Sequence, residues 1–195
     1  MRHLYLIGGA AGAGKTTVAR ALSRHLDADW VQVDSIWIAI REALSPDDAR
    51  RGPLEIDRAV RKMTHSAREL TSMHIEGSEI ICAALKTVLD FHIRESRMVV
   101  ADGAWLLPDF MANLQLPDAV IRSVVVHEPG AAEVRQAMDS RRPAPSTMPW
   151  QELSAEVSWR YGNWLQEESD RVGIPVVAAR PRGGLIARVG IALGA

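Results

Sequence analysis

The sequence predicts a three-layer α/β sandwich, in which a five-stranded parallel sheet is covered by helices on both faces. Five short apolar segments alternate along the chain with longer segments of helical periodicity. This alternation is typical of strands that are buried on both faces by crossover helices. In addition, the first apolar segment runs into a glycine-rich stretch, which is typical of the turn between a strand and a helix in such folds.

The elements follow one another in a regular order. Strands are predicted at residues 4–7, 30–33, 98–101, 120–126 and 174–178. Helices are predicted at residues 15–26, 35–44, 131–140 and 151–171, with a last helix after Gly184. Residues 54–95 are also expected to be mostly helical. Breaks are expected near residues 46–53, between this stretch and the helix at 35–44, and near Gly77. Ligands of such folds bind beyond the carboxyl ends of the strands, so the residues there are the functional candidates.

Length and composition narrow the classes of protein to consider. The chain has 195 residues, which suits a single domain, and its net charge of −1 argues against a nucleic-acid partner. No apolar run approaches the roughly 18 residues of a membrane span, so no membrane association is expected. Cys82 is the only cysteine, which excludes an internal disulfide and fits a cytoplasmic location. Either a monomer or a homodimer is expected.

Residues 9–16 match the Walker A pattern of a phosphate-binding loop, or P-loop. Its glycines let backbone N–H groups turn inward and surround phosphate oxygens, and the following helix adds its positive N-terminal dipole. Lys15 would reach the β- and γ-phosphates, and the Thr16 hydroxyl would bind Mg²⁺. ATP and Mg²⁺ are therefore the expected cofactors. The predicted nucleotide-binding residues of this segment are Gly9, Ala10, Ala11, Gly12, Ala13, Gly14, Lys15, Thr16 and Thr17.

The remainder of the sequence indicates phosphoryl transfer to a bound acceptor. No Asn-Lys-x-Asp base-reading motif of a GTPase follows any predicted strand. The third strand ends in Asp102-Gly103, and no glutamate follows to activate water as in hydrolysing ATPases. Both observations favour a kinase over a GTPase or an ATPase.

The chain resembles the P-loop small-molecule kinases, the group of nucleoside monophosphate, shikimate and gluconate kinases. Within that group it is most similar to the 2-phosphoglycerate kinase-like proteins. The resemblance rests on the P-loop, on Asp34 after the second strand, on the helical stretch 54–95, and on the segment 99–108. It implies one kinase domain over residues 1–195, with an acceptor-binding helical insert at 35–95 and a lid at 135–150.

Three positions depart from the pattern of the 2-phosphoglycerate kinase-like proteins. Asp102 replaces its usual glutamate, Trp105 replaces its histidine, and Trp37 replaces its arginine. The kinase class is therefore carried over, while the phosphoglycerate acceptor is not.

Two aspartates are candidate catalytic residues, each with a structural alternative. Asp34 is implied by the resemblance to contact the acceptor hydroxyl as a base or an orienting group, or else it caps the following helix. Asp102 is a candidate for holding Mg²⁺ through water, together with Thr16, or for contacting the acceptor. The structural alternative is that Asp102-Gly103 forms a hairpin turn. The predicted catalytic set is Lys15, Asp34, Asp102 and Arg141.

Arginines are the remaining candidates. Arg135, Arg141 and Arg142 stand where the resemblance implies a lid that closes over the phosphates, for which planar, permanently charged guanidinium groups are suited. The alternative is a solvated helix end. Arg180 follows the fifth strand, where related kinases contact adenine. Arg41 is a candidate ligand for an anionic acceptor, or else a solvent-facing helical residue.

The sequence thus predicts transfer of the γ-phosphoryl group of ATP to a hydroxyl or phosphate of a small-molecule acceptor. The alternative is a regulatory NTPase that acts as a nucleotide switch through a protein partner. An enzyme that phosphorylates nucleic-acid ends is disfavoured by the absence of a basic stripe.

Overall fold

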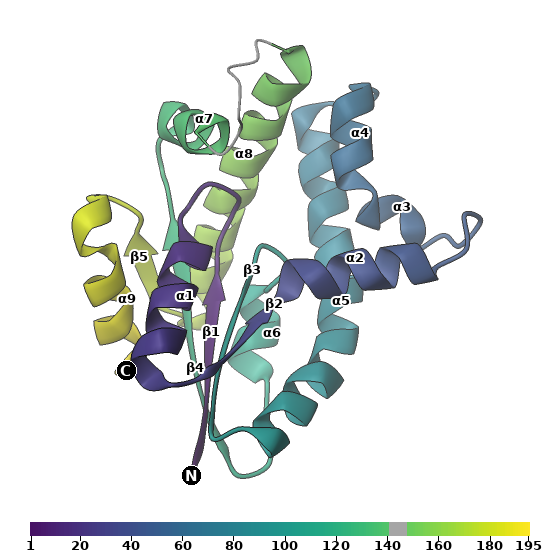
Figure 1. Cartoon of the computed structure of the whole chain (residues 1–195). Helices are drawn as coiled ribbons and strands as arrows, with labels where there is room; N and C mark the ends of the chain where they lie inside the picture. The colour runs from purple at the N-terminus through teal and green to yellow at the C-terminus, as the bar shows by residue number, and fades with distance from the viewer. Residues whose placement is uncertain (141–147) are drawn as a thin grey trace.

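Five parallel strands form the sheet in the part of the chain that the computed structural model describes, residues 1–140 and 148–195. Their order across the sheet is β2-β3-β1-β4-β5 (Figure 1). The strands are β1 (Arg2–Gly8), β2 (Asp29–Gln32), β3 (Met98–Gly103), β4 (Ala119–His127) and β5 (Val176–Ala178). The predicted parallel sheet is confirmed, and each strand lies within three residues of its predicted bounds.

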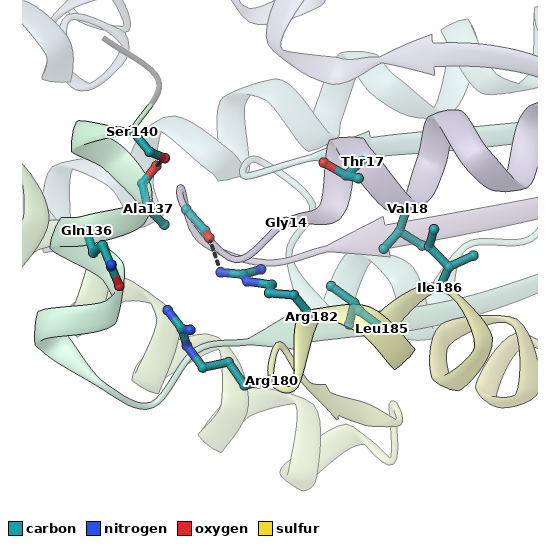
Figure 2. Close-up of a pocket in the computed structure, with 11 residues that line it drawn as sticks. Gly14, Thr17, Val18, Gln136, Ala137, Ser140, Arg180, Arg182, Leu185 and Ile186 are labelled. Atoms are coloured by element: carbon teal, nitrogen blue, oxygen red, sulfur yellow. Dashed lines mark hydrogen bonds between the residues drawn. The ribbon is translucent and has the colours of Figure 1, made fainter. Parts of the chain in front are cut away.

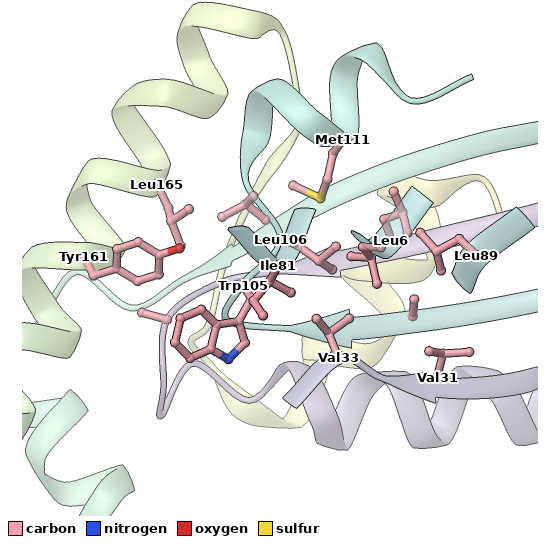
Figure 3. Close-up of a cluster of buried hydrophobic side chains, with 14 of the residues drawn as sticks. Leu6, Val31, Val33, Ile81, Leu89, Trp105, Leu106, Met111, Tyr161 and Leu165 are labelled. Atoms are coloured by element: carbon pink, nitrogen blue, oxygen red, sulfur yellow. The ribbon is translucent and has the colours of Figure 1, made fainter. Parts of the chain in front are cut away.

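Because side chains alternate between the two faces of a strand, β1 contributes to two separate cores. Leu4 and Leu6 pack on the face that is covered by α5, α6 and α8 (Figure 3). Tyr5 and Ile7 pack on the opposite face, against α1 and α9. This division explains why the sequence of β1 is a continuous apolar run. The strand ends at the centre of the molecule (Figure 1).

The helices connect the strands and extend beyond the sheet. Those packed on the sheet are α1 (Lys15–Leu26), α5 (Ala67–Glu95), α6 (Pro108–Asn113), α8 (Pro149–Val172) and α9 (Leu185–Leu193). The others are α2 (Val33–Ala43), α3 (Arg51–Leu54), α4 (Ile56–Lys62) and α7 (Ala131–Asp139), with a 3₁₀ turn, η1 (Arg182–Gly184). The helix α6 was not anticipated. None of the helices in these two ranges is both long and apolar enough to cross a membrane.

The predicted helix break at Gly77 is wrong, because α5 runs without interruption from Ala67 to Glu95. Gly77 serves close packing instead. A Cβ atom there would lie 2.8 Å from the carbonyl oxygen of Pro53 and 3.0 Å from the ring of Trp105. The glycine therefore allows α3 and the segment after β3 to approach α5 closely. The break predicted near residues 46–53 is confirmed, since α2 ends at Ala43 and α3 begins at Arg51.

The hairpin interpretation of Asp102-Gly103 is also wrong. Both residues lie at the end of β3, which pairs in parallel with β1 on one side and β2 on the other. Asp102 is paired with Ile7 and with Gln32, so its backbone belongs to the sheet rather than to a turn. This register brings the side chain of Asp102 to the carboxyl end of the parallel strands, where the P-loop begins.

Candidate active site

The P-loop leaves the end of β1 and wraps over the start of α1 (Figure 1). Gly9, Gly12 and Gly14 have φ values of 140°, 84° and 100°, a region of backbone conformation that favours glycine. At Gly9 a Cβ atom would also lie 2.4 Å from the carbonyl oxygen of Val126, so the loop passes directly against β4. The glycine spacing of the Walker A motif therefore has a steric reason in this chain.

Lys15 is the first residue of α1, and only 6% of its surface is exposed. Its Nζ donates a hydrogen bond to the carbonyl oxygen of Ala10, 3.2 Å away within the loop. A buried ammonium group is costly unless it has partners, so this contact stabilises the lysine at the loop. Lys15 and the loop N–H groups together form a positively polarised site for an anion.

Asp102 and Thr16 meet beneath the loop. Asp102 is 1% exposed, and its Oδ2 accepts a hydrogen bond of 2.7 Å from the Thr16 hydroxyl. These two oxygen ligands fit Mg²⁺, which prefers oxygen, keeps several waters and is bound in nucleotide sites by few protein groups together with phosphates. The chemistry of this donor pair is therefore compatible with the predicted metal.

The second oxygen of Asp102 is held by a residue that sequence reasoning did not single out. The indole Nε1–H of Trp30 donates to Oδ1 of Asp102 at 2.7 Å. The guanidinium of Arg20 lies over the Trp30 ring, 4.7 Å from its centroid. Trp30 therefore fixes the carboxylate so that its other oxygen is directed to Thr16.

Replacing Trp30 with Phe tests this positioning role. The ring and its Arg20 contact are retained, while the hydrogen bond to a buried charge, a contact worth about 1.5–3 kcal/mol, is lost. We expect about a tenfold higher Mg²⁺ requirement for binding of a fluorescent ATP analogue, with little change in its binding without Mg²⁺. An unchanged Mg²⁺ requirement would show that Trp30 serves packing alone.

Asp34 lies in the first turn of α2, two residues beyond Gln32, which is paired with Asp102 in the sheet. The capping interpretation is wrong, because Gln32 is the N-cap residue of α2. The carboxylate of Asp34 is half-buried and has no hydrogen bond or ion pair to any residue in the described ranges. It is thus available to a ligand that binds at the carboxyl end of the strands, where Thr16 and Asp102 also lie.

On the other side of the P-loop, two arginines meet a buried acid. Glu128, whose side chain is 3% exposed, accepts a hydrogen bond of 2.8 Å from Arg180 and one of 3.4 Å from Arg182. Arg182 also donates to the carbonyl oxygens of Gly12, at 2.8 Å, and of Ala13. Arg182 thus links the P-loop to the segments that follow β4 and β5.

A cavity of about 400 Å³ opens between these arginines and the helices α1, α7 and α9. In Figure 2, Arg180 and Arg182 reach toward it from below, and Leu185 closes it beside Gly14. Because the cavity adjoins the P-loop and combines apolar walls with two guanidinium groups, its position and chemistry suit the base and ribose of a nucleotide.

The predicted lid is only partly described. Arg135 lies on α7, where it forms an ion pair with Asp139 at 2.6 Å and a second one with Glu152 at 3.6 Å. Arg141 and Arg142 lie outside the described residues. Arg41, the candidate for an anionic acceptor, is largely buried and paired with Glu42 at 2.9 Å and Asp57 at 3.1 Å.

Aromatic side chains form a continuous stack between α2, α5 and α8. Trp37 stacks on Trp105 with 4.9 Å between ring centroids, and His74 packs 4.5 Å from Trp105 and 3.9 Å from Tyr161. The Nε2 atom of His74 is buried without a hydrogen-bond partner in the described residues. Burial, and secondarily the charge of Lys15, lowers the pKa of His74 to about 3. The imidazole is therefore neutral at physiological pH.

The lowered pKa of His74 predicts a pH dependence of stability. An unfolded histidine binds a proton below a pKa of 6.5, whereas folded His74 does not until about pH 3, so stability is present above pH 6.5 and is lost as the pH falls. When the pH falls from 7.5 to 5.0, this linkage lowers the free energy of unfolding by about 2 kcal/mol. In urea unfolding, the His74→Phe variant should lose about 2 kcal/mol less than the wild type over that interval. Equal losses would contradict a neutral buried His74.

Several residues of this site escaped sequence reasoning. Glu128 and Arg182 follow the predicted strands at 120–126 and 174–178 in the sequence, but no role was predicted for them, nor for Trp30 and His74. The position of Arg182 and Glu128 at strand ends was the signal that could have identified them. Trp30 and His74 carry no local signal, because their partners are distant in sequence.

No protein-family model matches this chain, and no curated protein matches it. Several solved structures, in contrast, match the chain in fold. A gluconokinase from Sinorhizobium meliloti 1021 superimposes with a TM-score of 0.58 at 16% identity, over 99% of this chain and 91% of the other. The chain has the fold of the P-loop small-molecule kinases.

Two further kinases support this assignment. A sugar kinase from Janibacter sp. HTCC2649 gives a TM-score of 0.54 at 18% identity, over 100% of this chain and 95% of the other. A shikimate kinase from Acinetobacter baumannii, solved in complex with shikimate, gives 0.52 at 17% identity, over 98% and 93%. At these identities the likeness concerns the fold, and the closer resemblance to 2-phosphoglycerate kinase-like proteins stays a prediction.

Proposed function

We propose that this protein is an ATP- and Mg²⁺-dependent kinase that phosphorylates a small-molecule acceptor. The observation that carries the proposal is the hydrogen bond between Thr16 and the buried Asp102, directly beneath a P-loop in a kinase fold. In P-loop enzymes these two residue types hold the metal, which when bound neutralises charge on the β- and γ-phosphates. The free carboxylate of Asp34 at the same edge supports an acceptor site beside them.

Each group of residues has a part in this proposal. The loop N–H groups and Lys15 bind the β- and γ-phosphates, while Arg180 and the cavity beside it take the base and ribose. Arg135, Arg141 and Arg142 are proposed to close over the phosphates. Asp34 orients the acceptor hydroxyl and receives its proton as the acceptor oxygen bonds to the γ-phosphorus. The bond between that phosphorus and the β,γ-bridging oxygen breaks, and ADP leaves.

The experiment combines γ-labelled ATP and Mg²⁺ with a pooled panel of metabolites, sugars and nucleosides, with products separated by mass. Transfer of label to one acceptor, absent without Mg²⁺, is the expected result. Release of labelled inorganic phosphate alone, together with a stable protein partner in pull-downs, would favour a nucleotide switch instead.

Asp34→Asn tests the catalytic assignment. The amide keeps the size of the side chain but cannot receive the acceptor proton, and general-base catalysis contributes about a hundredfold or more. We expect turnover to fall about a hundredfold while ATP affinity is retained. The matched control is Asp27→Asn, at an exposed left-handed position at the end of α1 that asparagine also tolerates. A loss of thermal stability without a loss of turnover would assign Asp34 to structure.

A further inference from the structure

Arg182 contacts the outer side of the P-loop through its guanidinium group. Its Nη2 donates a hydrogen bond to the carbonyl oxygen of Gly12 at 2.8 Å, and its Nη1 donates one to the carbonyl oxygen of Ala13. Figure 2 shows this side chain reaching the loop beside Gly14, with a hydrogen bond drawn as a dashed line. The two carbonyl groups belong to consecutive peptide units of the Walker A motif, so one side chain fixes two adjoining peptide planes.

The orientation of these two peptide units determines where their N–H groups point. In a planar trans peptide the N–H is directed away from the C=O, so the N–H groups of Ala13 and Gly14 face away from Arg182. For Ala13 the partner lies inside the loop, because its N–H donates at 3.3 Å to the carbonyl oxygen of Ala10, which also accepts from Lys15. N–H groups on this inner side are the ones that surround phosphate oxygens. A cation at the carbonyl oxygens also polarises the peptide units, which strengthens the hydrogen bonds that their N–H groups donate.

The position of Arg182 is itself fixed by residues distant in sequence. Glu128 accepts from Arg182 at 3.4 Å, and only 3% of the side chain of this acid is exposed. A buried carboxylate needs partners, so the charge of Glu128 holds the guanidinium at this place. Gly14 leaves the space that the guanidinium occupies, since a Cβ atom there would overlap Nη1 of Arg182. The acid, the arginine and the glycine together form a support for the outer side of the loop.

We propose that Arg182 is a positioning residue that holds the P-loop in the shape that binds the phosphates of the nucleotide, and that Glu128 holds Arg182 in place. This role rests on the proposed nucleotide-dependent function, which it deepens. Arg182 lines the cavity proposed for the base and ribose, yet its printed partners are the loop and Glu128. Loss of Arg182 should therefore weaken the binding of the phosphates, whether or not a base is attached to them.

Two probes separate the phosphates from the base. Inorganic tripolyphosphate carries three phosphates without a nucleoside, and a non-hydrolysable ATP analogue carries both. Binding of each is measured by calorimetry with Mg²⁺ present, so the readout does not require turnover. In Arg182→Gln we expect both probes to bind about tenfold more weakly, by the same factor, because the hydrogen bonds of a charged group to the loop are lost. If Arg182 acted on the base, only the ATP analogue would bind more weakly.

Two further variants separate positioning from charge and from stability. Arg182→Lys keeps the positive charge, but one ammonium group cannot replace the planar fork that reaches both carbonyls and Glu128, so most of the loss should remain. Arg122→Gln is the matched control, because Arg122 also donates to two consecutive carbonyl oxygens, those of Leu193 at 2.8 Å and Gly194 at 2.5 Å. These carbonyls lie at the end of α9. A decrease in Tm common to both Gln variants is structural, whereas the binding of tripolyphosphate should change only in Arg182→Gln.

The outcomes distinguish the role of Arg182 from the proposed function. Unchanged binding of tripolyphosphate by Arg182→Gln, an equal loss in Arg122→Gln, or full binding by Arg182→Lys would overturn the positioning role. Wild-type protein that binds the ATP analogue but not tripolyphosphate would overturn it as well, because the loop would not be shaped for phosphates on its own. Binding of neither probe by the wild type would overturn the nucleotide site and this role together. The expected losses in a protein that transfers phosphate to no acceptor would overturn the kinase function and retain the role of Arg182.

Discussion

Lys15→Ala is expected to abolish phosphoryl transfer while the fold survives. Lys15 is the lysine of the P-loop, and its ammonium group is held at the loop by the carbonyl oxygen of Ala10. Removing a preorganised cation from a transferring phosphoryl group costs about a thousandfold or more in rate. The measurement is the initial rate of label transfer from γ-labelled ATP to the acceptor that the panel identifies.

The same variant should remain folded, because removing a buried ammonium also removes the cost of burying it. Thermal unfolding should therefore show no decrease in Tm. Lys86→Ala is the matched control, since it removes an exposed lysine from α5. If Lys15→Ala transferred the phosphoryl group as fast as the Lys86→Ala control, the active site would have to lie elsewhere.

Asp102→Asn is expected to have the second largest effect. The amide keeps the shape of the side chain and removes the negative charge that would pair with Mg²⁺, a contribution of several kcal/mol to metal-assisted transfer. We expect turnover at ordinary Mg²⁺ concentrations to fall about a thousandfold, with partial recovery as Mg²⁺ is raised. Nucleotide binding without Mg²⁺ should change little, which separates loss of the metal site from loss of the P-loop.

Asp118→Asn provides the control for this change of charge. Asp118 is exposed and has a φ value of 57°, a conformation that asparagine adopts readily. A double-mutant cycle with Trp30→Phe adds a sharper criterion. If Trp30 acts through Asp102, the two substitutions together should cost little more than Asp102→Asn alone. Additive losses would contradict that coupling.

The parts of the fold that the sequence predicted are those with local patterns. A short apolar run, a glycine-rich loop and an amphipathic helix follow one another within 26 residues, so β1, the P-loop and α1 could be located directly. The strands could be located for the same reason, because parallel strands buried on both faces are continuous apolar runs. Asp34 and Asp102 were identified as candidates because they stand at strand ends, where ligands of such folds bind.

The parts that escaped prediction depend on contacts between distant residues. Gly77 resembles a helix breaker locally, yet the nearest neighbours of its missing side chain are Pro53 and Trp105. Trp30 is tied to Asp102, and Arg182 to Gly12. A pattern read along the chain contains no such pairing. Arg41 was predicted to be a candidate ligand for anions for the same reason. Its partner Asp57 lies on another helix, so the pairing is not visible in the sequence.

The strand order has a consequence for how this protein is made. The central strand β1 comes first in the chain, and its register pairs His3 with Met98 and Leu4 with Ile121. During synthesis β1 must therefore wait, unpaired and strongly apolar, until about half of the protein has emerged from the ribosome. Its neighbour β4 arrives later still, and the P-loop rests on β4 at Gly9. The proposed nucleotide site is thus completed late in folding, and nascent chains of this protein are expected to engage chaperones before that site has formed.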